Sequence, residues 1–379
     1  MNTEDSYFDV IIVGGGLAGL SSAIHLSKFK IKVLVIEKNT YPKHKVCGEY
    51  ISNEVLPYLK FLDIDVFKYD AHKINSFELT TIKNKIIKVR LPLGGFGISR
   101  YCLDNILAKK VLESNVEILK DAVEDITFIN KTFSVKTKSD TTYKAKLVIG
   151  AYGKRANLDT KLNRQFIKEK SPFLAVKIHA TGNFPDNLVA LHNFKGGYCG
   201  VSKVENNKIN ICYITNYNTF KKHKNIQAFQ KEILYKNEHL KSIFKNSTSV
   251  FDVPLTISQI SFLNKKPVEN HVLMCGDTAG MIHPLAGNGM SMAIRSAQIV
   301  SSLIIDYLDG NIKSRYLLEK QYSMLWNKEF KNRINTGKFI AYLFSLNIVS
   351  EIIVLILKPF PKVLQYIIKR THGKIMTTS

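Results

Sequence analysis

Length, composition and charge restrict the class of protein before any motif is considered. The chain has 379 residues, more than one hydrophobic core usually serves, and its five cysteines form neither a CxxC pair nor a metal-site spacing, which excludes a disulfide scaffold and a zinc finger. The lysines behind the net charge of +23 are spread along the whole chain, without a nucleic-acid-binding motif. We therefore expect a cytoplasmic protein of about two domains, with no nucleic-acid partner and no metal.

The first predicted elements form a βαβ unit. Residues 8–13 are an apolar run typical of a buried strand, residues 17–29 have helical spacing, and residues 32–39 are a second apolar run. Together they predict two parallel strands joined by a helix.

Three glycines separate the first strand from its helix. Gly14, Gly16 and Gly19 form G-x-G-x-x-G, in which the first permits a tight turn, the second admits a pyrophosphate and the third lets helix and strand pack closely. Glu37 ends the second strand, where a carboxylate binds ribose hydroxyls and repels a 2′-phosphate, which favours FAD or NAD over NADP. The predicted dinucleotide site comprises Gly14, Gly16, Leu17, Ala18, Gly19, Glu37 and Lys38.

Further along, two kinds of sheet are expected. Apolar alternation within residues 76–97 predicts strands of another sheet, residues 99–113 a helix, and residues 146–153 a buried strand that returns to the first sheet. Between residues 171 and 214, short strands separated by Gly, Asn and Pro turns predict an antiparallel sheet. A basic amphipathic helix is expected at about 223–245.

These elements predict an α/β fold in which a discontinuous nucleotide-binding domain carries an inserted antiparallel substrate domain. The chain is expected to be helical from about residue 312. The expected boundaries are 1–75, 98–158 and 265–311 for the FAD-binding domain, 76–97 and 159–264 for the substrate domain, and 312–379 for the C-terminal helical region.

A second glycine-rich turn lies far downstream, in GDTAGMIHPLAGNGMS at residues 276–291. Asp277 ends an apolar run and is expected to bind the ribityl chain of a flavin. Gly287, Asn288 and Gly289 bring backbone against the flavin ring, and the helix expected to begin near Met290 directs its positive end at the ring edge that is anionic when reduced. NAD needs no second loop of this kind, so the two turns together indicate FAD.

The two motifs together resemble those of the FAD-dependent hydroxylase and geranylgeranyl reductase superfamily. The segment YPKHKVCGEYIS at residues 41–52 resembles the P-x-x-K-x-C-G stretch of geranylgeranyl reductases, and ISRYCLDNIL resembles the R-x-x-L/F-D-x-x-L segment. The resemblance implies a glutathione-reductase-type FAD-binding Rossmann fold, with Arg100 near the FAD phosphates or ribityl chain and the backbone of Val123 at the adenine.

The loop that holds Cys47 carries several alternatives. The resemblance places Cys47 and Gly48 beside the flavin ring, where the thiol would position substrate or pass a proton; otherwise Cys47 is a small residue that packs a turn. Glu49 either orders the loop or is solvated, and Lys45 is expected to be solvated.

Two departures from the superfamily pattern concern the reaction. Tyr152 stands where hydroxylases carry the Asp of an Asp-Gly pair, so direct hydroxylase-type use of NADPH is in doubt, and transient NAD(P)H or another donor is expected to reduce the flavin. The chain has one tryptophan, Trp326, and lacks the W-x-W-x-I-P segment of flavin halogenases, which argues against a halogenase.

Residues of the inserted sheet are expected to roof the substrate cavity. His192, Tyr198 and Cys199 each serve more often as packing or surface residues than as catalysts, and His283 is expected to be a bystander beside the flavin loop. Cys47 and Tyr198 are nevertheless the two candidates for a catalytic acid.

An apolar stretch at residues 339–362 is nearly long enough to cross a bilayer, but Glu351 would lie near its centre. It is expected to be a helix that covers an apolar pocket, a peripheral contact with the inner face of the membrane through residues 339–370, or a span. Its flanking lysines favour an anionic surface.

The leading functional hypothesis is an FAD-dependent oxidoreductase that reduces carbon–carbon double bonds of a hydrophobic prenyl or isoprenoid lipid. One alternative is a monooxygenase that hydroxylates an aromatic or polyene substrate. A third is a lipid-binding flavoprotein without turnover. The substrate, the electron donor and the oligomeric state do not follow from the sequence.

Overall fold

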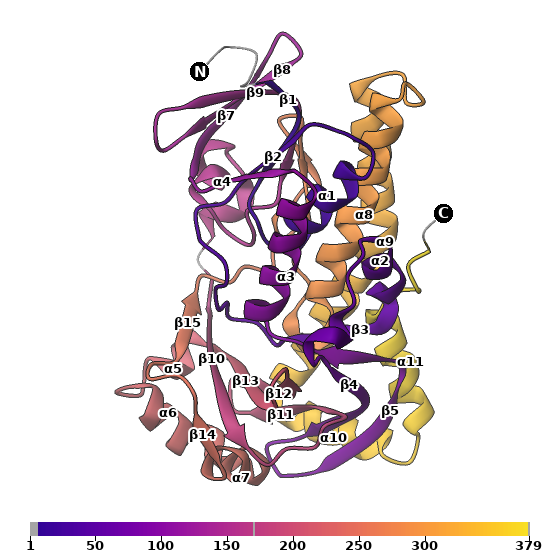
Figure 1. Cartoon of the computed structure of the whole chain (residues 1–379). Helices are drawn as coiled ribbons and strands as arrows, with labels where there is room; N and C mark the ends of the chain where they lie inside the picture. Colours follow the sequence, from indigo (N-terminus) through magenta and orange to yellow (C-terminus); the bar gives the residue numbers. More distant parts are fainter. Residues whose placement is uncertain (1–6, 170, 378–379) are drawn as a thin grey trace.

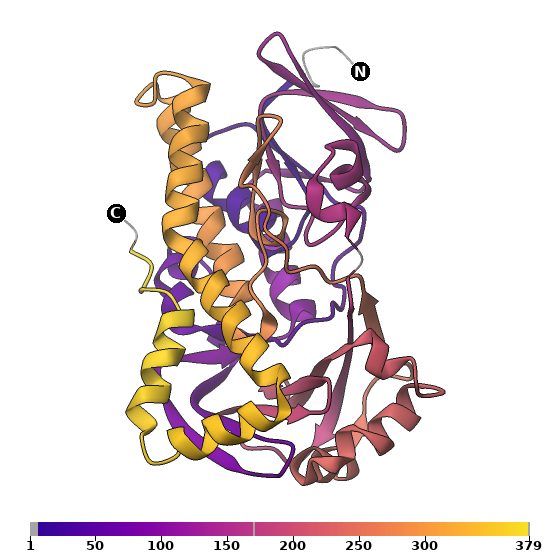
Figure 2. The ribbon, with the colours of Figure 1, turned by 180° about the vertical axis from the view of Figure 1, so that it is seen from behind.

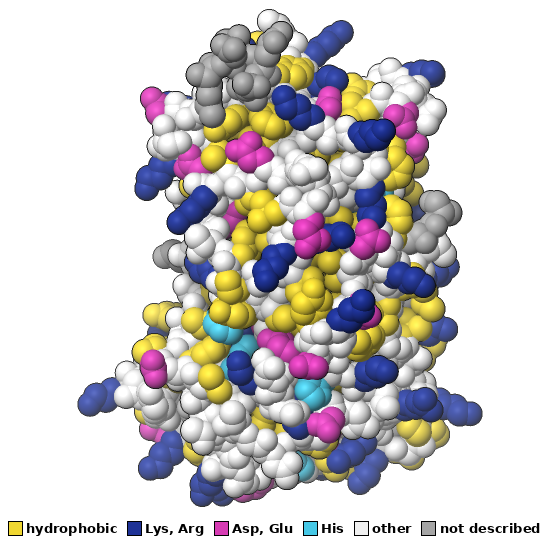
Figure 3. All heavy atoms as spheres, viewed as in Figure 1, with side chains coloured by type: hydrophobic (Ala, Val, Ile, Leu, Met, Phe, Trp, Pro, Cys, Tyr) yellow, Lys and Arg dark blue, Asp and Glu magenta, His cyan; other side chains and the backbone are white. Residues whose placement is uncertain are grey.

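The computed structural model describes residues 7–169 and 171–377, which form two sheets placed end to end and two long helices that run beside both (Figures 1 and 2). The first sheet has eight strands and the second has nine. Among the residues that are described, Lys and Arg side chains are scattered over the whole face shown in Figure 3 rather than gathered in one stripe.

The first sheet has the parallel core that the sequence predicts. β1 lies between β2 and β9, and β17 lies on the far side of β9, all in parallel. All four residues of β2 are buried, as expected for a strand covered on both faces. The strands of this sheet are β1 (Tyr7–Val13), β2 (Val33–Ile36), β6 (Glu117–Leu119), β7 (Val123–Ile129), β8 (Thr132–Thr137), β9 (Thr142–Gly150), β16 (Val268–Glu269) and β17 (Val272–Met274).

The second sheet is antiparallel apart from one pair, because β11 runs parallel to β4. β3 and the start of β4 pair within this sheet, although residues 1–75 were expected to belong to the FAD-binding domain. The expected domain boundaries stay a prediction. Its strands are β3 (Tyr50–Ser52), β4 (His72–Thr80), β5 (Ile86–Gly97), β10 (Phe173–Gly182), β11 (Leu188–Phe194), β12 (Gly197–Val204), β13 (Lys208–Asn216), β14 (Ser247–Ser249) and β15 (Leu255–Ser258).

The helix predicted over residues 223–245 is wrong as a single element. It divides into α6 (Ile226–Glu232) and α7 (Glu238–Lys245), with a 3₁₀ turn between them. The cause is Asn237, which is fully buried: its side-chain oxygen caps α7, and its amide donates to the Thr80 hydroxyl at 2.8 Å and to the Asn193 carbonyl at 3.1 Å. These bonds to the sheet replace continuation of the helix.

The remaining helices cover the first sheet and close the second. Ser99 caps α3, because its side-chain oxygen accepts from the Cys102 N–H. Their bounds are α1 (Leu17–Ser27), α2 (Leu56–Phe61), α3 (Arg100–Glu113), α4 (Asn157–Lys161), α5 (Tyr217–Phe220), α8 (Gly289–Leu308), α9 (Arg315–Ser345), α10 (Asn347–Leu357) and α11 (Pro361–Thr371).

The apolar C-terminal stretch is bent rather than straight. The end of α9 and the following helix α10 meet at 111°, and no single helix among the described residues is long and apolar enough to cross a membrane. Glu351 is buried and accepts hydrogen bonds from the Thr81 hydroxyl at 2.8 Å and the Lys83 N–H at 2.9 Å. The predicted helix therefore consists of two, and its single carboxylate is fixed against the turn between β4 and β5.

Candidate functional site

The first glycine turn has the geometry that a dinucleotide needs. Gly14 has φ +106°, and a Cβ there would lie 2.5 Å from the Ala151 carbonyl oxygen, while a Cβ at Gly19 would collide with the Gly14 carbonyl. Gly16 is the N-cap of α1 and has no side chain that could cap the helix, so the first N–H groups of α1 have no side-chain acceptor at this position. A helix N-terminus of this kind binds anions through these donors and the helix dipole.

Glu37 lies beside this turn at the end of β2. Its carboxylate accepts from the Gly15 N–H at 2.7 Å and the Asn39 N–H at 2.9 Å, while Lys38 is exposed. Glu37 Oε1 also accepts from the side-chain amide of Asn39 at 2.6 Å, so its two acceptor sites are occupied, whereas Oε2 accepts only the Gly15 N–H and keeps a site for a ribose hydroxyl. The Glu37 N–H donates to the carbonyl of Leu119 at the end of β6, four residues before Val123, which places that strand end at the same edge.

The second glycine turn presents backbone in the way the sequence predicts. Gly287 has φ +64°, and Gly289 begins α8, within one residue of the expected start. Asn288 is buried, and its amide donates to the Thr371 carbonyl at 2.9 Å, so its side chain ties this turn to α11. The N-terminus of α8, too, has no side-chain cap.

The two turns lie at one edge of the first sheet. A Cβ at Gly276 would lie 3.1 Å from Ala18 of α1 and 3.5 Å from Ala293 of α8, because both helices pack against this point. The Gly153 N–H, just beyond β9, donates to the Thr278 hydroxyl at 2.8 Å, so the loops that follow β9 and β17 are joined. Asp277 is half-buried in this loop. The N-terminus of α1 and the loop before α8, about 260 residues apart in the sequence, therefore lie against each other.

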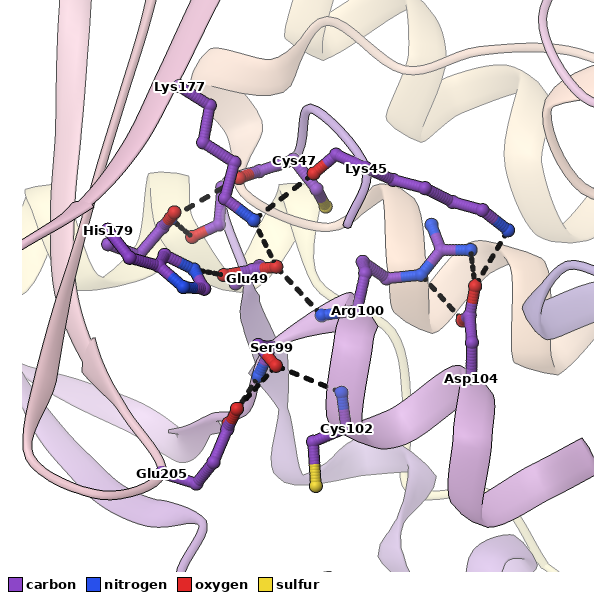
Figure 4. Close-up of polar contacts among 12 residues, drawn as sticks. Lys45, Cys47, Glu49, Ser99, Arg100, Cys102, Asp104, Lys177, His179 and Glu205 are labelled. Carbon is purple, nitrogen blue, oxygen red and sulfur yellow. Dashed lines mark hydrogen bonds and ion pairs between the residues drawn. The ribbon is translucent and has the colours of Figure 1, made fainter. Parts of the chain in front are cut away.

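Arg100 links the glycine turn to the neighbouring loop (Figure 4). A Cβ at Gly16 would lie 3.7 Å from its Nη2 atom. Its guanidinium donates to Asp104 at 2.7 and 2.8 Å, and Lys45 binds the same carboxylate at 2.7 Å. Burial alone would lower the pKa of Arg100, but Asp104 outweighs it and raises the pKa. Lys45 had been expected to be solvated, but the structure shows that it is paired with Asp104.

Behind this loop lies a buried ionic network. Glu49 is fully buried, with a left-handed φ of +54°, and binds Lys177 and, at 2.6 Å, His179 (Figure 4). The N–H of Arg100 donates to the same carboxylate at 2.7 Å. Burial raises the pKa of Glu49, but Lys177 and His179 outweigh burial and hold the pKa below its ordinary value. Of the two alternatives for Glu49, the structure shows the loop-ordering one.

The same network holds the carbonyl groups of the Cys47 loop. Lys177 donates to the Lys45 carbonyl at 3.1 Å, and Asn210 donates to the carbonyls of Cys47 and Gly48 at 3.2 and 2.8 Å. Space is open beside the Cα of Gly48, since an added Cβ would have no protein atom within 4 Å. The loop is therefore held by side chains of the second sheet, and the space beside Gly48 is open.

An apolar cavity of about 390 Å³ begins at this loop. Cys47, Gly48 and Gly287 form its inner end, and aliphatic and aromatic side chains of the second sheet, α9, α10 and α11 form the rest of its wall. A cavity of this size and lining suits a hydrophobic small molecule.

Tyr198 is placed in the cavity wall with its hydroxyl buried and without a hydrogen-bond partner among the described residues. Burial raises its pKa well above the ordinary value, with a smaller effect of Cys212 and Cys199, so the phenol stays protonated. Cys199 and His192 are buried but do not line the cavity, and His192 bonds to Thr80 at 2.8 Å, as expected of packing residues.

His283 and Tyr152 also have structural partners. The ring of His283 caps the turn before Gly287, and burial lowers its pKa to about 4. Tyr152 contacts Asp159, which forms a buried ion pair with Arg164 at 2.9 Å. Neither arrangement assigns a reaction.

Three residues of this site escape sequence reasoning. Lys177, His179 and Asn210 lie on strands β10 and β13, more than 125 residues from the loop that they hold. The one available signal is that Lys177 and His179 alternate with apolar residues in FLAVKIHA, so both face one side of a strand. That pattern predicts which face of the strand carries the two side chains, but it does not predict that the loop of Glu49 packs against that face.

These observations fit a dinucleotide that carries a flavin. Two uncapped helix N-termini, a strand-end carboxylate, a half-buried guanidinium and an open face beside Gly48 lie near one edge of the first sheet, and the apolar cavity starts where the second turn ends.

Comparison with known proteins agrees with this geometry. Residues 7–323 match the family model described as FAD binding domain. The chain is 23% identical to digeranylgeranylglycerophospholipid reductase of Methanococcus vannielii over 368 residues, covering 91% of this chain and 88% of that protein. It is 23% identical to squalene monooxygenase of Mus musculus over 351 residues, covering 85% of this chain and 59% of that protein.

Among solved structures, the fold matches that of flavin-dependent brominase Bmp2 with a TM-score of 0.78, at 17% identity over 96% of this chain and 93% of that one. At this identity the likeness shows the fold alone, so the expectation against a halogenase stays a prediction. The relatives include both a reductase and a monooxygenase, and they do not resolve the substrate. The chain belongs to the FAD-binding domain family and is an FAD-dependent oxidoreductase of that family.

Proposed function

We propose that the protein reduces a carbon–carbon double bond of a prenyl or isoprenoid lipid. The observation that carries this proposal is the apolar cavity of about 390 Å³, whose lining includes Cys47, Gly48 and Gly287 of the two loops expected beside the flavin ring. A relative named as a reductase of a digeranylgeranyl lipid, similar over 88% of its own length, supports this substrate class.

The chain offers a separate group of contacts for each part of FAD. The N-terminus of α1 and Arg100 would hold the phosphates, Glu37 the ribose, and the backbone at Val123 the adenine. Asp277 would bind the ribityl chain, and the N-terminus of α8 would face the ring. The proposed FAD contacts are Gly14, Gly16, Leu17, Ala18, Gly19, Glu37, Lys38, Cys47, Gly48, Arg100, Val123, Asp277, Gly287, Asn288, Gly289 and Met290.

When bound and reduced by NAD(P)H or another donor, FAD would supply the hydride for one carbon of the double bond. The chain must supply the proton for the other carbon. The Tyr198 hydroxyl is protonated, buried in the cavity wall and without an acceptor among the described residues, and the Cys47 thiol lines the inner end. Both can hold a proton at the cavity surface, and solvent replaces it after each turnover.

The second candidate function is a monooxygenase. The similarity to squalene monooxygenase favours it, and the same cavity would hold an aromatic or polyene substrate. In that case the product keeps an oxygen atom from O₂, and the protonation of carbon by Tyr198 or Cys47 has no part in the reaction.

Turnover with a polyprenyl lipid, with and without oxygen, separates these functions. A reductase adds a pair of hydrogen atoms per double bond in either atmosphere, and mass spectrometry of the product shows this gain. A product that carries an oxygen atom, formed only in air, would contradict the reductase. Tight lipid binding with no product under either condition would support a lipid-binding flavoprotein instead.

A further inference from the structure

The outer surface of the C-terminal helices carries a concentration of exposed apolar side chains. On α10, Ile348, Ile352, Leu355 and Ile356 are all exposed, and Ile348 is 76% exposed. They are spaced by three, four, seven and eight residues, so they share one helix face. Phe360, in the turn to α11, is 58% exposed. We call these five residues the apolar end face.

The fold fixes this face outward. Glu351 and Val354 of α10 are buried against the rest of the protein, and the Glu351 carboxylate is bound by Thr81 and by Lys83 of the turn between β4 and β5. α10 lies across the end of the molecule farthest from the β7–β8 hairpin (Figures 1 and 2). The side chains of the apolar end face therefore point away from the protein as one surface, larger than the single apolar residues usual on a soluble protein.

The C-terminal helices that carry the apolar end face hold exposed cations and no exposed acid. Lys358, Lys362, Lys369, Arg370 and Lys374 are all exposed, and in the part of the chain that the structure describes none of them forms an ion pair. Glu351 is the one acidic residue after position 329, and it is buried. This distribution of charge complements an anionic surface.

The same helices wall the apolar cavity on their inner side. Phe339 of α9 and Tyr366 of α11 line the cavity and are 61% and 57% exposed, so the cavity opens between these helices. Arg370 is at this opening as well, with its guanidinium 5.3 Å from the centre of the Tyr366 ring. The opening thus lies between the same C-terminal helices that carry the apolar end face, and a cation is at its edge.

We propose that the apolar end face docks on an anionic phospholipid bilayer, and that the lipid substrate enters the cavity from the bilayer between α9 and α11. The docking follows from exposure and charge alone, whereas the entry route rests on the proposed function. In this orientation α10 lies in the interface, the lysines face the headgroups, and the glycine turns stay on the aqueous side.

Flotation of the purified full chain with vesicles tests the docking without any substrate. We expect binding to vesicles of phosphatidylcholine with a quarter of phosphatidylglycerol, weaker binding to phosphatidylcholine alone, and a decrease with added salt. The double variant Ile356→Ser and Phe360→Ser should lower the bound fraction roughly tenfold, because both side chains are exposed and neither lines the cavity.

The matched control is Ile129→Ser with Val253→Ser, which removes two apolar side chains elsewhere that are at least as exposed. It should bind vesicles as the wild type does. Equal binding by all three proteins, no binding by the wild type, or a concentration-dependent dimer that is lost in the Ile356→Ser and Phe360→Ser variant would each overturn the proposal.

A second measurement separates this proposal from the proposed function. If both hold, the Ile356→Ser and Phe360→Ser variant keeps its turnover of a detergent-dispersed lipid and loses turnover of the same lipid in vesicles. If the wild type binds vesicles but turns over neither form, the docking stands and the proposed function fails. Equal loss of turnover in detergent and in vesicles would contradict the entry route.

Discussion

Glu49→Gln is the most informative single change, because it keeps the shape of a buried side chain and removes its charge. Glu49 and Lys177 are both fully buried. In the variant, the Lys177 ammonium retains the Lys45 carbonyl at 3.1 Å as an acceptor but has no carboxylate beside it. Leaving one partner of a buried ion pair without the other costs about 3–5 kcal/mol.

The expected change in melting temperature follows from the size of the chain. With about 2.1 cal/mol/K of unfolding entropy per residue, 379 residues give about 0.8 kcal/mol/K, so the loss corresponds to roughly 4–6 °C. Thermal unfolding followed by circular dichroism at pH 7 measures it. The control Asp186→Asn affects the ion pair with Lys203, whose carboxylate is 74% exposed, and should cost about 0–1 kcal/mol.

Two further results complete the test. The double variant Glu49→Gln with Lys177→Met should recover more than half of the loss, because no unpaired charge remains. The pKa of Glu49 is held below its ordinary value, so its contribution is present above a pH of about 4.3 and is lost as the pH falls through the lower folded value. A Glu49→Gln variant that melts within a degree of Asp186→Asn would refute this reasoning.

Three other predictions concern the turns, the cavity and acid stability. Gly48→Ala should fold and melt as the wild type does but retain less FAD, measured by flavin absorbance per chain. Gly14→Ala, in contrast, should fail to fold, because its Cβ meets the Ala151 carbonyl. Equal FAD content in Gly48→Ala and wild type would place the flavin elsewhere. Tyr198→Phe should lower kcat on a prenyl lipid about 10²-fold with KM little changed, and unchanged kcat would exclude it as the acid. Burial lowers the pKa of His192 to about 3, so the free energy of unfolding should fall by up to about 1.4 kcal/mol per pH unit below about pH 6.5. His192→Gln, compared with the wild type by urea denaturation at pH 7 and pH 5, should show a smaller fall. An equal fall in both proteins would contradict a lowered pKa of His192.

Much of the nucleotide-binding part was predictable because its motifs are local. A buried strand, glycines at fixed spacing and a helix start lie within about 15 residues of each other, and backbone sterics alone decide that Gly14 must be glycine. The second turn around Gly287 could be predicted for the same reason. Each of these turns depends on residues adjacent in the chain.

The network behind Cys47 was not predictable in the same way. Its stability depends on Lys177 of β10 meeting Glu49, 128 residues earlier in the chain, and a lysine within a strand is normally expected at the surface. The helix expected over residues 223–245 failed for a related reason. Asn237 finds partners on β4 and β11 that no local pattern contains.

The bend between α9 and α10 shows a third limit. Composition alone predicts one apolar segment over residues 339–362, with Glu351 as an unfavourable charge. The structure satisfies that carboxylate by turning α10 across the end of the second sheet, where Thr81 and Lys83 bind it. Tertiary contacts therefore decide the direction of the segment, while the sequence decides that its outer face is apolar.

The most direct test of where FAD binds is a crystal structure of the chain soaked with FAD. We expect one FAD per chain, with the pyrophosphate at the N-terminus of α1 beside Arg100 and the ring between Gly48 and Gly287, at the inner end of the apolar cavity. FAD bound at any other surface, or crystals that stay colourless after soaking in excess FAD, would contradict it.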